Sequence, residues 1–99
     1  MTQADVTDVL KRFATRLREN GATALYIFGS RARGTERPES DLDLFIDYDR
    51  HRKVPDIFEL MRVESEMSSV LGVPVTITTR TALHPLMKGE IERQSVRVL

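Results

Sequence analysis

The 99-residue sequence contains no cysteine and no tryptophan, and it carries no excess of charge of either sign. Without cysteine the chain can form no disulfide and no thiolate-bound metal site, which fits a cytoplasmic protein. Fifteen basic residues balance fifteen acidic ones, so nothing in the overall charge argues for direct binding of nucleic acid. No apolar run approaches the ~20 residues of a membrane span. The N-terminal segment also lacks the basic flank and apolar block of a signal peptide.

What remains is the composition of an ordinary globular protein. Hydrophobic residues make up 40% of the chain and charged residues 30%. The length suits one domain, and no repeat, linker or low-complexity tract divides it. We therefore expect a single domain spanning residues 1–99, with neither a membrane nor a nucleic acid as its direct partner.

Two predicted strands flank a polar loop near the middle of the chain. The first strand, residues 24–29, is apolar and ends at the pair Gly29-Ser30. Ten residues later the second strand, 42–48, begins just after Asp41 and contains Asp43. Alternate side chains of a strand share a face, so the two aspartates point the same way, roughly 6.5–7 Å apart along the backbone.

Two carboxylates on one face of a strand repel each other, and aspartate is a poor strand former. A divalent cation explains such a pair, because Mg²⁺ is held by one or two carboxylates together with phosphate oxygens of the substrate. The backbone N–H groups at Gly29-Ser30 lead into a helical turn and can cradle a phosphate. Arg31 and Arg33 add positive charge to this turn. Metal-binding carboxylates that face a phosphate-binding turn imply nucleotide chemistry.

The pattern Gly29-Ser30, ten residues, then Asp41-x-Asp43, with Arg33-Gly34 inside the gap, resembles the signature of minimal nucleotidyltransferases. These are the smallest members of the DNA polymerase β-like nucleotidyltransferase superfamily. The resemblance implies transfer of AMP from Mg·ATP to an acceptor hydroxyl. It also implies catalytic, Mg²⁺-binding roles for the two aspartates, and contact of the Gly29-Ser30 turn and Arg33 with the β- and γ-phosphates. Ser40, just before Asp41, is included among the expected nucleotide-binding residues; its hydroxyl can hydrogen-bond either a phosphate or the turn, and the sequence favours neither.

One position departs from the family pattern. Active members place a third acid early in the third strand, where it completes the metal shell and accepts the proton of the attacking hydroxyl. The matching residue here is Thr76, whose neutral hydroxyl does neither well. The departure bears on catalysis rather than on nucleotide binding.

A domain of this size forms only half of a nucleotide cleft, so we expect another chain to supply the missing wall. By resemblance, stand-alone minimal nucleotidyltransferases pair with a small helical HEPN-domain protein, often a ribonuclease toxin. They act as its MntA-like antitoxin by adenylylating it. A second hypothesis is an inactive nucleotide-binding antitoxin that neutralises its partner by binding alone. Modification of a small molecule, as in aminoglycoside nucleotidyltransferases, is disfavoured because the chain has no acceptor-binding domain.

The predicted fold class is α/β, a small mixed sheet with helices packed mainly on one face. Helices 4–19 and 55–71 are expected to pack on one side of strands 24–29, 42–48, 74–79 and 95–98, leaving the other face open near the aspartates. A short helix is expected from Ser30 to Arg33, and another over 83–93. Helix 55–71 is predicted to pack on the sheet through a buried apolar stripe that consists of Ile57, Leu60, Met61, Met67 and Leu71.

Three other charged features are predicted to lie in solvent. The basic loop 50–53 is expected to be a solvated surface. Asp47 shares the face of the two aspartates but lies roughly 13 Å beyond Asp43, too far to share a metal, and is expected at the surface. Glu64 interrupts the apolar stripe of helix 55–71 and is expected to reach water.

Overall fold

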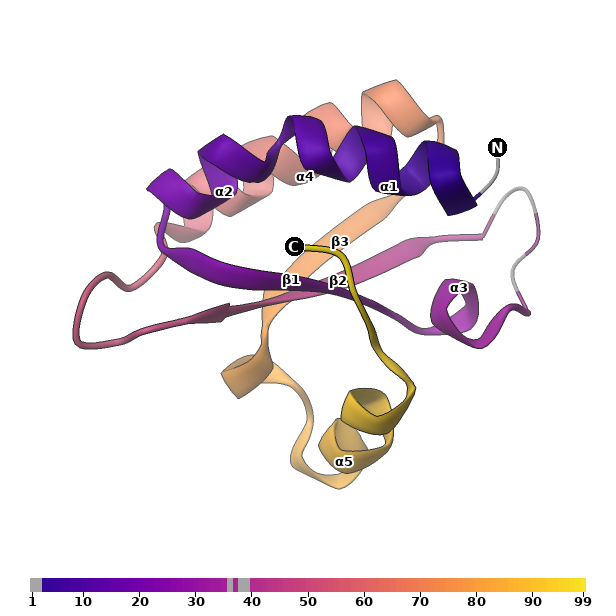
Figure 1. Cartoon of the computed structure of the whole chain (residues 1–99). Helices are drawn as coiled ribbons and strands as arrows, with labels where there is room; N and C mark the ends of the chain where they lie inside the picture. Colours follow the sequence, from indigo (N-terminus) through magenta and orange to yellow (C-terminus); the bar gives the residue numbers. More distant parts are fainter. Residues whose placement is uncertain (1–2, 36, 38–39) are drawn as a thin grey trace.

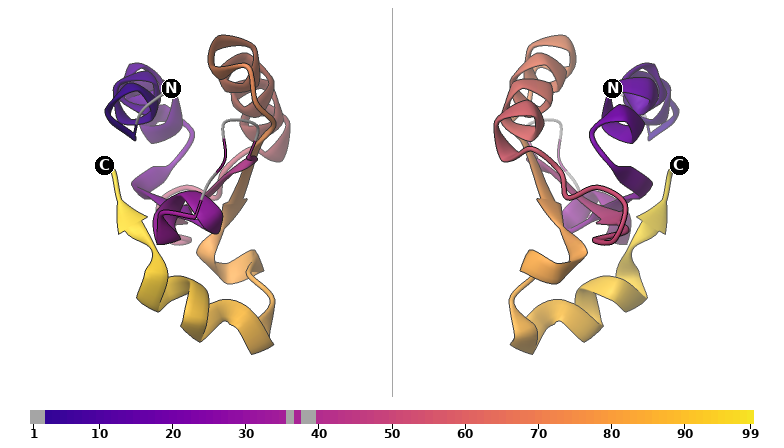
Figure 2. Two further views of the ribbon diagram at one scale, coloured as in Figure 1. Left: turned by 90° about the vertical axis from the view of Figure 1, so that its right-hand side faces the viewer. Right: turned by 90° about the vertical axis from the view of Figure 1, so that its left-hand side faces the viewer.

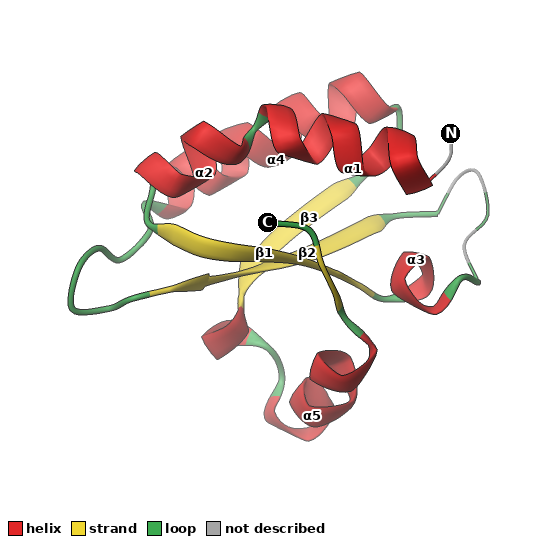
Figure 3. Ribbon diagram, viewed as in Figure 1, coloured by secondary structure: helices red, strands yellow, loops and turns green. Residues whose placement is uncertain are grey.

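The computed structural model describes residues 3–35, 37 and 40–99. Its helices and strands alternate along the chain (Figure 3). Their bounds, in order, are α1 Gln3–Arg12, α2 Ala14–Glu19, β1 Ala22–Phe28, α3 Ser30–Arg33, β2 Leu42–Tyr48, α4 Ile57–Leu71, β3 Val75–Thr79, η1 Arg80–Ala82, α5 Pro85–Gln94 and β4 Val96–Arg97. The predicted strand 42–48 and the short helix at Ser30 are confirmed, and the other ends agree with the prediction or differ from it by one or two residues.

The four strands form one mixed sheet in the order β3-β2-β1-β4. β1 pairs antiparallel with β2 and β4, whereas β2 and β3 run parallel and are joined by α4. Helices α1, α2 and α4 cover one face of this sheet, as Figure 1 shows. The side views in Figure 2 place α5 on the opposite face. The predicted fold class is therefore confirmed.

The core fills the space between the three helices and the sheet. In β2, Leu42, Leu44 and Ile46 point into it at every second position, as the alternating sequence predicts. Phe45 points to the other face, where its ring stacks on Tyr26 at 4.8 Å between centroids. The remaining fully buried core residues are Val6, Leu10, Leu17, Leu25, Ile27, Val63 and Met67. Both faces of the central strands are thus covered.

The first helix is divided in two. Phe13 leaves helical geometry (φ −95°, ψ 0°), and its N–H donates to the carbonyl of Leu10, which tightens one turn between α1 and α2. Asn20 ends α2 and is 5% exposed. Its side-chain amide donates to the carbonyl of Asp56 (3.0 Å) and its side-chain oxygen accepts from the Asp56 N–H (2.8 Å). This pair of bonds ties the end of α2 to the start of α4.

The buried stripe of α4 differs from the predicted one. Leu60, Val63 and Met67 face the core, but Ile57 and Met61 are 65% and 56% exposed. Two apolar stripes overlap in this helix, one at 57/61 and one at 60/63/67, and only the second packs on the sheet. The prediction that Ile57 and Met61 are buried is therefore wrong, because the helix turns that side of its surface to solvent.

Glu64 has a structural role that the sequence does not reveal. Its carboxylate accepts a hydrogen bond from the backbone N–H of Ile77, at 2.6 Å, in the edge strand β3. An unpaired N–H on an edge strand is a site for unwanted pairing with other chains. Glu64 occupies this donor. The expectation that its carboxylate extends into water is therefore wrong.

Arg80 links α5 to the face of the sheet that lies opposite α1, α2 and α4. Its guanidinium lies 5.0 Å from the centre of the Tyr26 ring and 4.9 Å from that of Phe45. It donates to both carboxylate oxygens of Asp47, at 2.6 and 3.0 Å, and also to Glu92 of α5. The hydrogen bonds to Asp47 are the main reason that the pKa of Arg80 is raised. Asp47 is therefore half-buried in an ion pair, which corrects its predicted place at the surface.

No helix in the part of the chain that the structure describes is both long and apolar enough to cross a membrane.

Candidate active site

The two motif segments meet where β1 ends and β2 begins. The antiparallel register sets Phe28 opposite Asp43, so the Gly29-Ser30 turn and the aspartate pair lie at the same end of the sheet. β1 leads directly into α3 at this end (Figure 1). Asp41 comes just before β2 and is exposed, whereas Asp43 lies within the strand and is half-buried. The hairpin register therefore brings together residues that are far apart in the sequence.

Gly29 and Asp43 approach so closely that no side chain fits between them. A Cβ atom added to Gly29 would lie 2.6 Å from Oδ2 of Asp43. Gly29 also has φ +76° and ψ −153°, a backbone conformation that is essentially restricted to glycine. Two independent reasons therefore require glycine here. The backbone conformation disfavours other residues, and the Asp43 carboxylate leaves no room for a side chain. The predicted convergence of the turn with the acid pair is present for Asp43.

The charges of Asp41 and Arg33 both act on the Asp43 carboxyl. The pKa of the Asp43 carboxyl is raised, first because partial burial disfavours its charge and second because the Asp41 carboxylate repels it. The positive charge of Arg33 opposes this rise. Two repelling carboxylates, one of them partly desolvated, form a local excess of negative charge that a cation would relieve.

Removing the charge of Asp43 is expected to stabilise the metal-free chain. The raised pKa means that the folded protein binds this proton more readily than the unfolded chain does. The charged form therefore destabilises the fold, and this loss sets in as the pH rises from the ordinary aspartate range through the raised pKa. We expect Asp43→Asn to have a higher free energy of unfolding than the wild type at pH 7 in EDTA, measured by urea denaturation. The difference should vanish at acidic pH, where both side chains are neutral.

The control for this measurement is Asp49→Asn, which changes an exposed carboxylate at the far end of β2. It should leave the free energy of unfolding nearly unchanged at both pH values. An Asp43→Asn variant that is less stable than the wild type at pH 7 would contradict the raised pKa.

The site opens into a cavity of about 340 Å³ between the end of β1 and α5. One side is lined by Phe28, Gly29, Arg33 and Asp43. The other side is formed by five residues of α5: Leu86, Met87, Glu90, Ile91 and Gln94. The face near the aspartates is therefore partly covered, which corrects the expectation that it lies open. Helical spacing predicts a helix at 83–93, but no sequence signal shows that it packs beneath this site.

The loop between α3 and β2 has its own internal support. Arg31 is 6% exposed, and its guanidinium donates to the carbonyl of Ser40 at 2.9 Å. The hydroxyl of Ser40 accepts from the backbone N–H of Arg37 at 2.7 Å. Of the two roles that the sequence left open for Ser40, these contacts favour the turn. Ser30 is half-buried at the first position of α3, where helix N–H groups have no acceptor within the helix.

Thr76 occupies the position next to the acid pair on β3. The parallel register pairs Thr76 with Asp43, and Thr76 is exposed. A carboxylate at this position would lie beside Asp43, so the predicted match of Thr76 to the third acid agrees with the geometry. In the described residues no group of three acids, histidines or cysteines is arranged to hold a metal ion. Asp41 and Asp43 nevertheless fit Mg²⁺, which needs only one or two protein carboxylates when a triphosphate supplies further oxygens.

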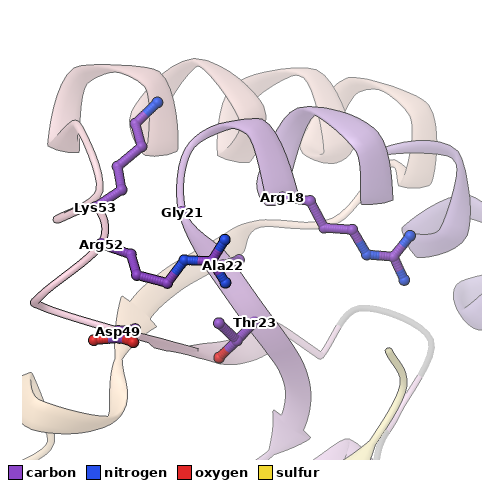
Figure 4. Close-up of a pocket in the computed structure, with 7 residues that line it drawn as sticks. All are labelled: Arg18, Gly21, Ala22, Thr23, Asp49, Arg52 and Lys53. Atoms are coloured by element: carbon purple, nitrogen blue, oxygen red, sulfur yellow. The ribbon is translucent and has the colours of Figure 1, made fainter.

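A second cavity, of about 210 Å³, lies at the opposite end of β1 (Figure 4). Three cationic side chains line it, those of Arg18, Arg52 and Lys53. Lys53 donates to the carbonyl of Glu19, and Arg18 and Arg52 are exposed. A single acid, Asp49, and Gly21 also line this cavity, but the described residues that line it include neither a pair of acids nor a turn that leads into a helix. We therefore take the cavity beside Asp43 as the candidate active site.

Comparison with known proteins points to the same chemistry. The model of the nucleotidyltransferase domain family matches residues 10–98. A relative from Methanocaldococcus jannaschii, named as a candidate protein adenylyltransferase, is 30% identical over 95 residues. The matched region covers 96% of this chain and 99% of the relative.

Solved structures share the fold. One, of a candidate minimal nucleotidyltransferase, is 30% identical with a TM-score of 0.68 and covers 95% of this chain and 89% of its own. A chain of a toxin–antitoxin pair with AMP-PNP is 18% identical with a TM-score of 0.74, covering 94% and 72%. A chain from the complex of a tri-AMPylated HEPN toxin with its MNT antitoxin, from Shewanella oneidensis, is 15% identical. Its TM-score is 0.70, and the match covers 99% and 72%.

Proposed function

Because this chain belongs to the nucleotidyltransferase domain family, we propose that it is a Mg²⁺-dependent protein adenylyltransferase that transfers AMP from ATP to a hydroxyl group of a partner protein. We propose further that the partner is a HEPN-type ribonuclease toxin and that the chain is its antitoxin. The observation that carries the proposal is the contact between Asp43 and Gly29, which unites the acid pair with the phosphate-binding turn.

Each site residue receives a role that its position allows. Asp41 and Asp43 would hold Mg²⁺, which when bound supplies positive charge to the triphosphate. The N–H groups at the start of α3 would bind the β- and γ-phosphates, since the first N–H groups of a helix are free to donate. Arg33 lines the same cavity and would contact the leaving diphosphate. The Ser40 hydroxyl accepts from the Arg37 N–H, and its own proton would be free to donate to a phosphate.

The reaction follows from this arrangement. The acceptor oxygen attacks the α-phosphorus in line and forms a new P–O bond, while the bond from the α-phosphorus to the bridging oxygen breaks. Diphosphate leaves with those electrons, and the hydroxyl proton passes to solvent. Positioning and charge neutralisation supply most of the catalysis in phosphoryl-group transfer, so a site built from backbone donors, one arginine and two acids can suffice.

The comparisons support the choice of acceptor. The relative from Methanocaldococcus jannaschii carries the name of a protein adenylyltransferase, and the structure from Shewanella oneidensis pairs an AMPylated HEPN toxin with an MNT antitoxin. In the described part of the chain, the end of the sheet forms one side of the cavity at Asp43 and α5 forms the other, and the cavity is open to solvent between them. A protein acceptor would complete such an incomplete cleft.

A second candidate function is neutralisation by binding alone. It is favoured by Thr76, which stands beside Asp43 where a third acid would complete the metal shell and accept a proton. In that case the chain binds ATP and its partner without transferring AMP.

One assay tests the proposed function. The purified chain is incubated with ATP, Mg²⁺ and a HEPN-domain protein, and the mass of that protein is followed over time. We expect a mass increase equal to one or more AMP groups, which EDTA abolishes and added Mg²⁺ restores. A partner that is neutralised without any change in mass would contradict adenylyl transfer and support the binding function.

A further inference from the structure

The first turn of α5 places two large apolar side chains in solvent beside the candidate active site. Leu86 is 90% exposed and Met87 is 58% exposed, and both line the cavity that contains the Asp43 carboxylate. Phe28 and Ile91 extend the apolar lining deeper into the same cavity. Single exposed apolar residues are common on protein surfaces, but an adjacent pair at the rim of a polar site indicates a contact surface.

The position of this pair is held firmly. Arg80 reaches from η1 to Glu92 of α5 and to Asp47 of β2, so α5 is tied to the face of the sheet that carries the acid pair. Leu86 follows Pro85, the first residue of the helix, which fixes the backbone of this turn. These contacts therefore fix the position of the first turn of α5 relative to the cavity.

We propose that Leu86 and Met87 form the contact surface for the acceptor protein and receive an apolar side chain of the partner that lies next to the modified hydroxyl. The proposal rests on the proposed function. The α-phosphorus must lie at Asp41 and Asp43, so an acceptor hydroxyl can reach it only if the partner covers the mouth of the cavity. α5 forms one side of that mouth. Methionine adapts its shape to varied partners, which suits such a contact.

A different apolar surface serves as the comparison. Phe58 is the second residue of α4, as Leu86 is of α5, and it is 67% exposed. It lies on the helix that covers the opposite face of the sheet (Figures 1 and 2). Glutamate is tolerated in the first turn of a helix because its charge interacts favourably with the helix dipole. Leu86→Glu and Phe58→Glu are therefore matched variants that both should fold.

Two measurements on these variants test the contact. The rate of AMP transfer is measured as a function of partner concentration, and partner binding is measured directly without ATP. For Leu86→Glu we expect the KM for the partner and its dissociation constant to rise at least tenfold, about 1.4 kcal/mol. The thermal stabilisation by Mg·ATP is measured in parallel on each variant, so that an effect of the added charge on nucleotide binding is separated from an effect on the partner. Leu86→Met should restore wild-type behaviour, and Phe58→Glu should resemble the wild type.

Three results would overturn the proposal. Loss of Mg·ATP stabilisation in Leu86→Glu, with unchanged partner affinity, would mean that α5 contacts the nucleotide base instead. Equal weakening by Phe58→Glu would mean that any added negative charge disturbs the complex. Unchanged binding in Leu86→Glu would exclude the contact outright. Because binding is measured without ATP, a chain that proves unable to transfer AMP still tests this surface.

Discussion

The chain carrying both Asp41→Asn and Asp43→Asn is expected to modify its partner at least about a thousandfold more slowly than the wild type. The pair would supply the carboxylates for Mg²⁺, and electrostatic stabilisation by a bound metal contributes several kcal/mol to such reactions, about 4 kcal/mol for a thousandfold effect. Asparagine has nearly the same shape, and removal of the Asp43 charge relieves a repulsion, so the variant should fold. The readout is the mass of the partner protein as a function of time.

Ligand-induced stabilisation gives an independent readout of the same variant. Mg·ATP at 100 times its Kd should stabilise the wild type by about 2.7 kcal/mol, and the double variant should lose most of this gain. The control is Asp49→Asn, which removes a carboxylate at the opposite end of β2. It should retain both transfer and stabilisation.

The outcome also separates the two candidate functions. Neutralisation of the partner that persists in the double variant, with no mass change in either protein, would identify a chain that acts by binding. Transfer at the wild-type rate in the double variant would contradict the assignment of Asp41 and Asp43 altogether. The neutral side chain at Thr76 makes this test necessary, because β3 carries no acid at the position that pairs with Asp43.

The features that the sequence predicts well depend on short-range patterns. The strand at Leu42–Tyr48 follows from apolar residues at every second position, 42, 44 and 46, since one face must be apolar to meet the helices. The short helix from Ser30 ends at Gly34, which adopts the left-handed conformation that glycine favours. The meeting of Asp43 with Gly29 could be predicted because two adjacent antiparallel strands bring a fixed pair of positions together.

The features that it misses depend on contacts between distant segments. Arg80 contacts Tyr26, Phe45 and Glu92, which come from three different elements. Nothing near position 80 in the sequence indicates that this arginine holds α5 against the sheet. Arg31 is buried and donates to the carbonyl of Ser40, nine residues along the chain, a contact that spacing in the sequence does not show. α4 carries two apolar stripes, and only the shape of the sheet decides which of them is buried.

Gly29→Ala is expected to remove most activity while costing only part of the stability. The new Cβ would lie 2.6 Å from Oδ2 and 3.5 Å from Cγ of Asp43. The carboxylate is the end of a movable side chain, so the fold can make room by turning it away from the glycine. That movement takes Asp43 out of the position in which it faces the phosphate-binding turn. We expect at least a hundredfold loss of transfer, since small displacements of a reacting group cost about this much.

The stability of Gly29→Ala should fall by about 1–3 kcal/mol, the range for a residue held in a conformation that it rarely adopts. Gly72→Ala is the matched control, because Gly72 also has a positive φ, of +73°, but nothing lies within 4 Å of an added Cβ. It should lose about 1–2 kcal/mol by urea denaturation and keep its transfer rate. If Gly29→Ala lost the same stability as Gly72→Ala and transferred AMP at the wild-type rate, the close approach of Gly29 and Asp43 would have no catalytic meaning. If transfer is lost in Gly29→Ala but kept in Gly72→Ala, then Gly29 positions the Asp43 carboxylate as well as shaping the turn.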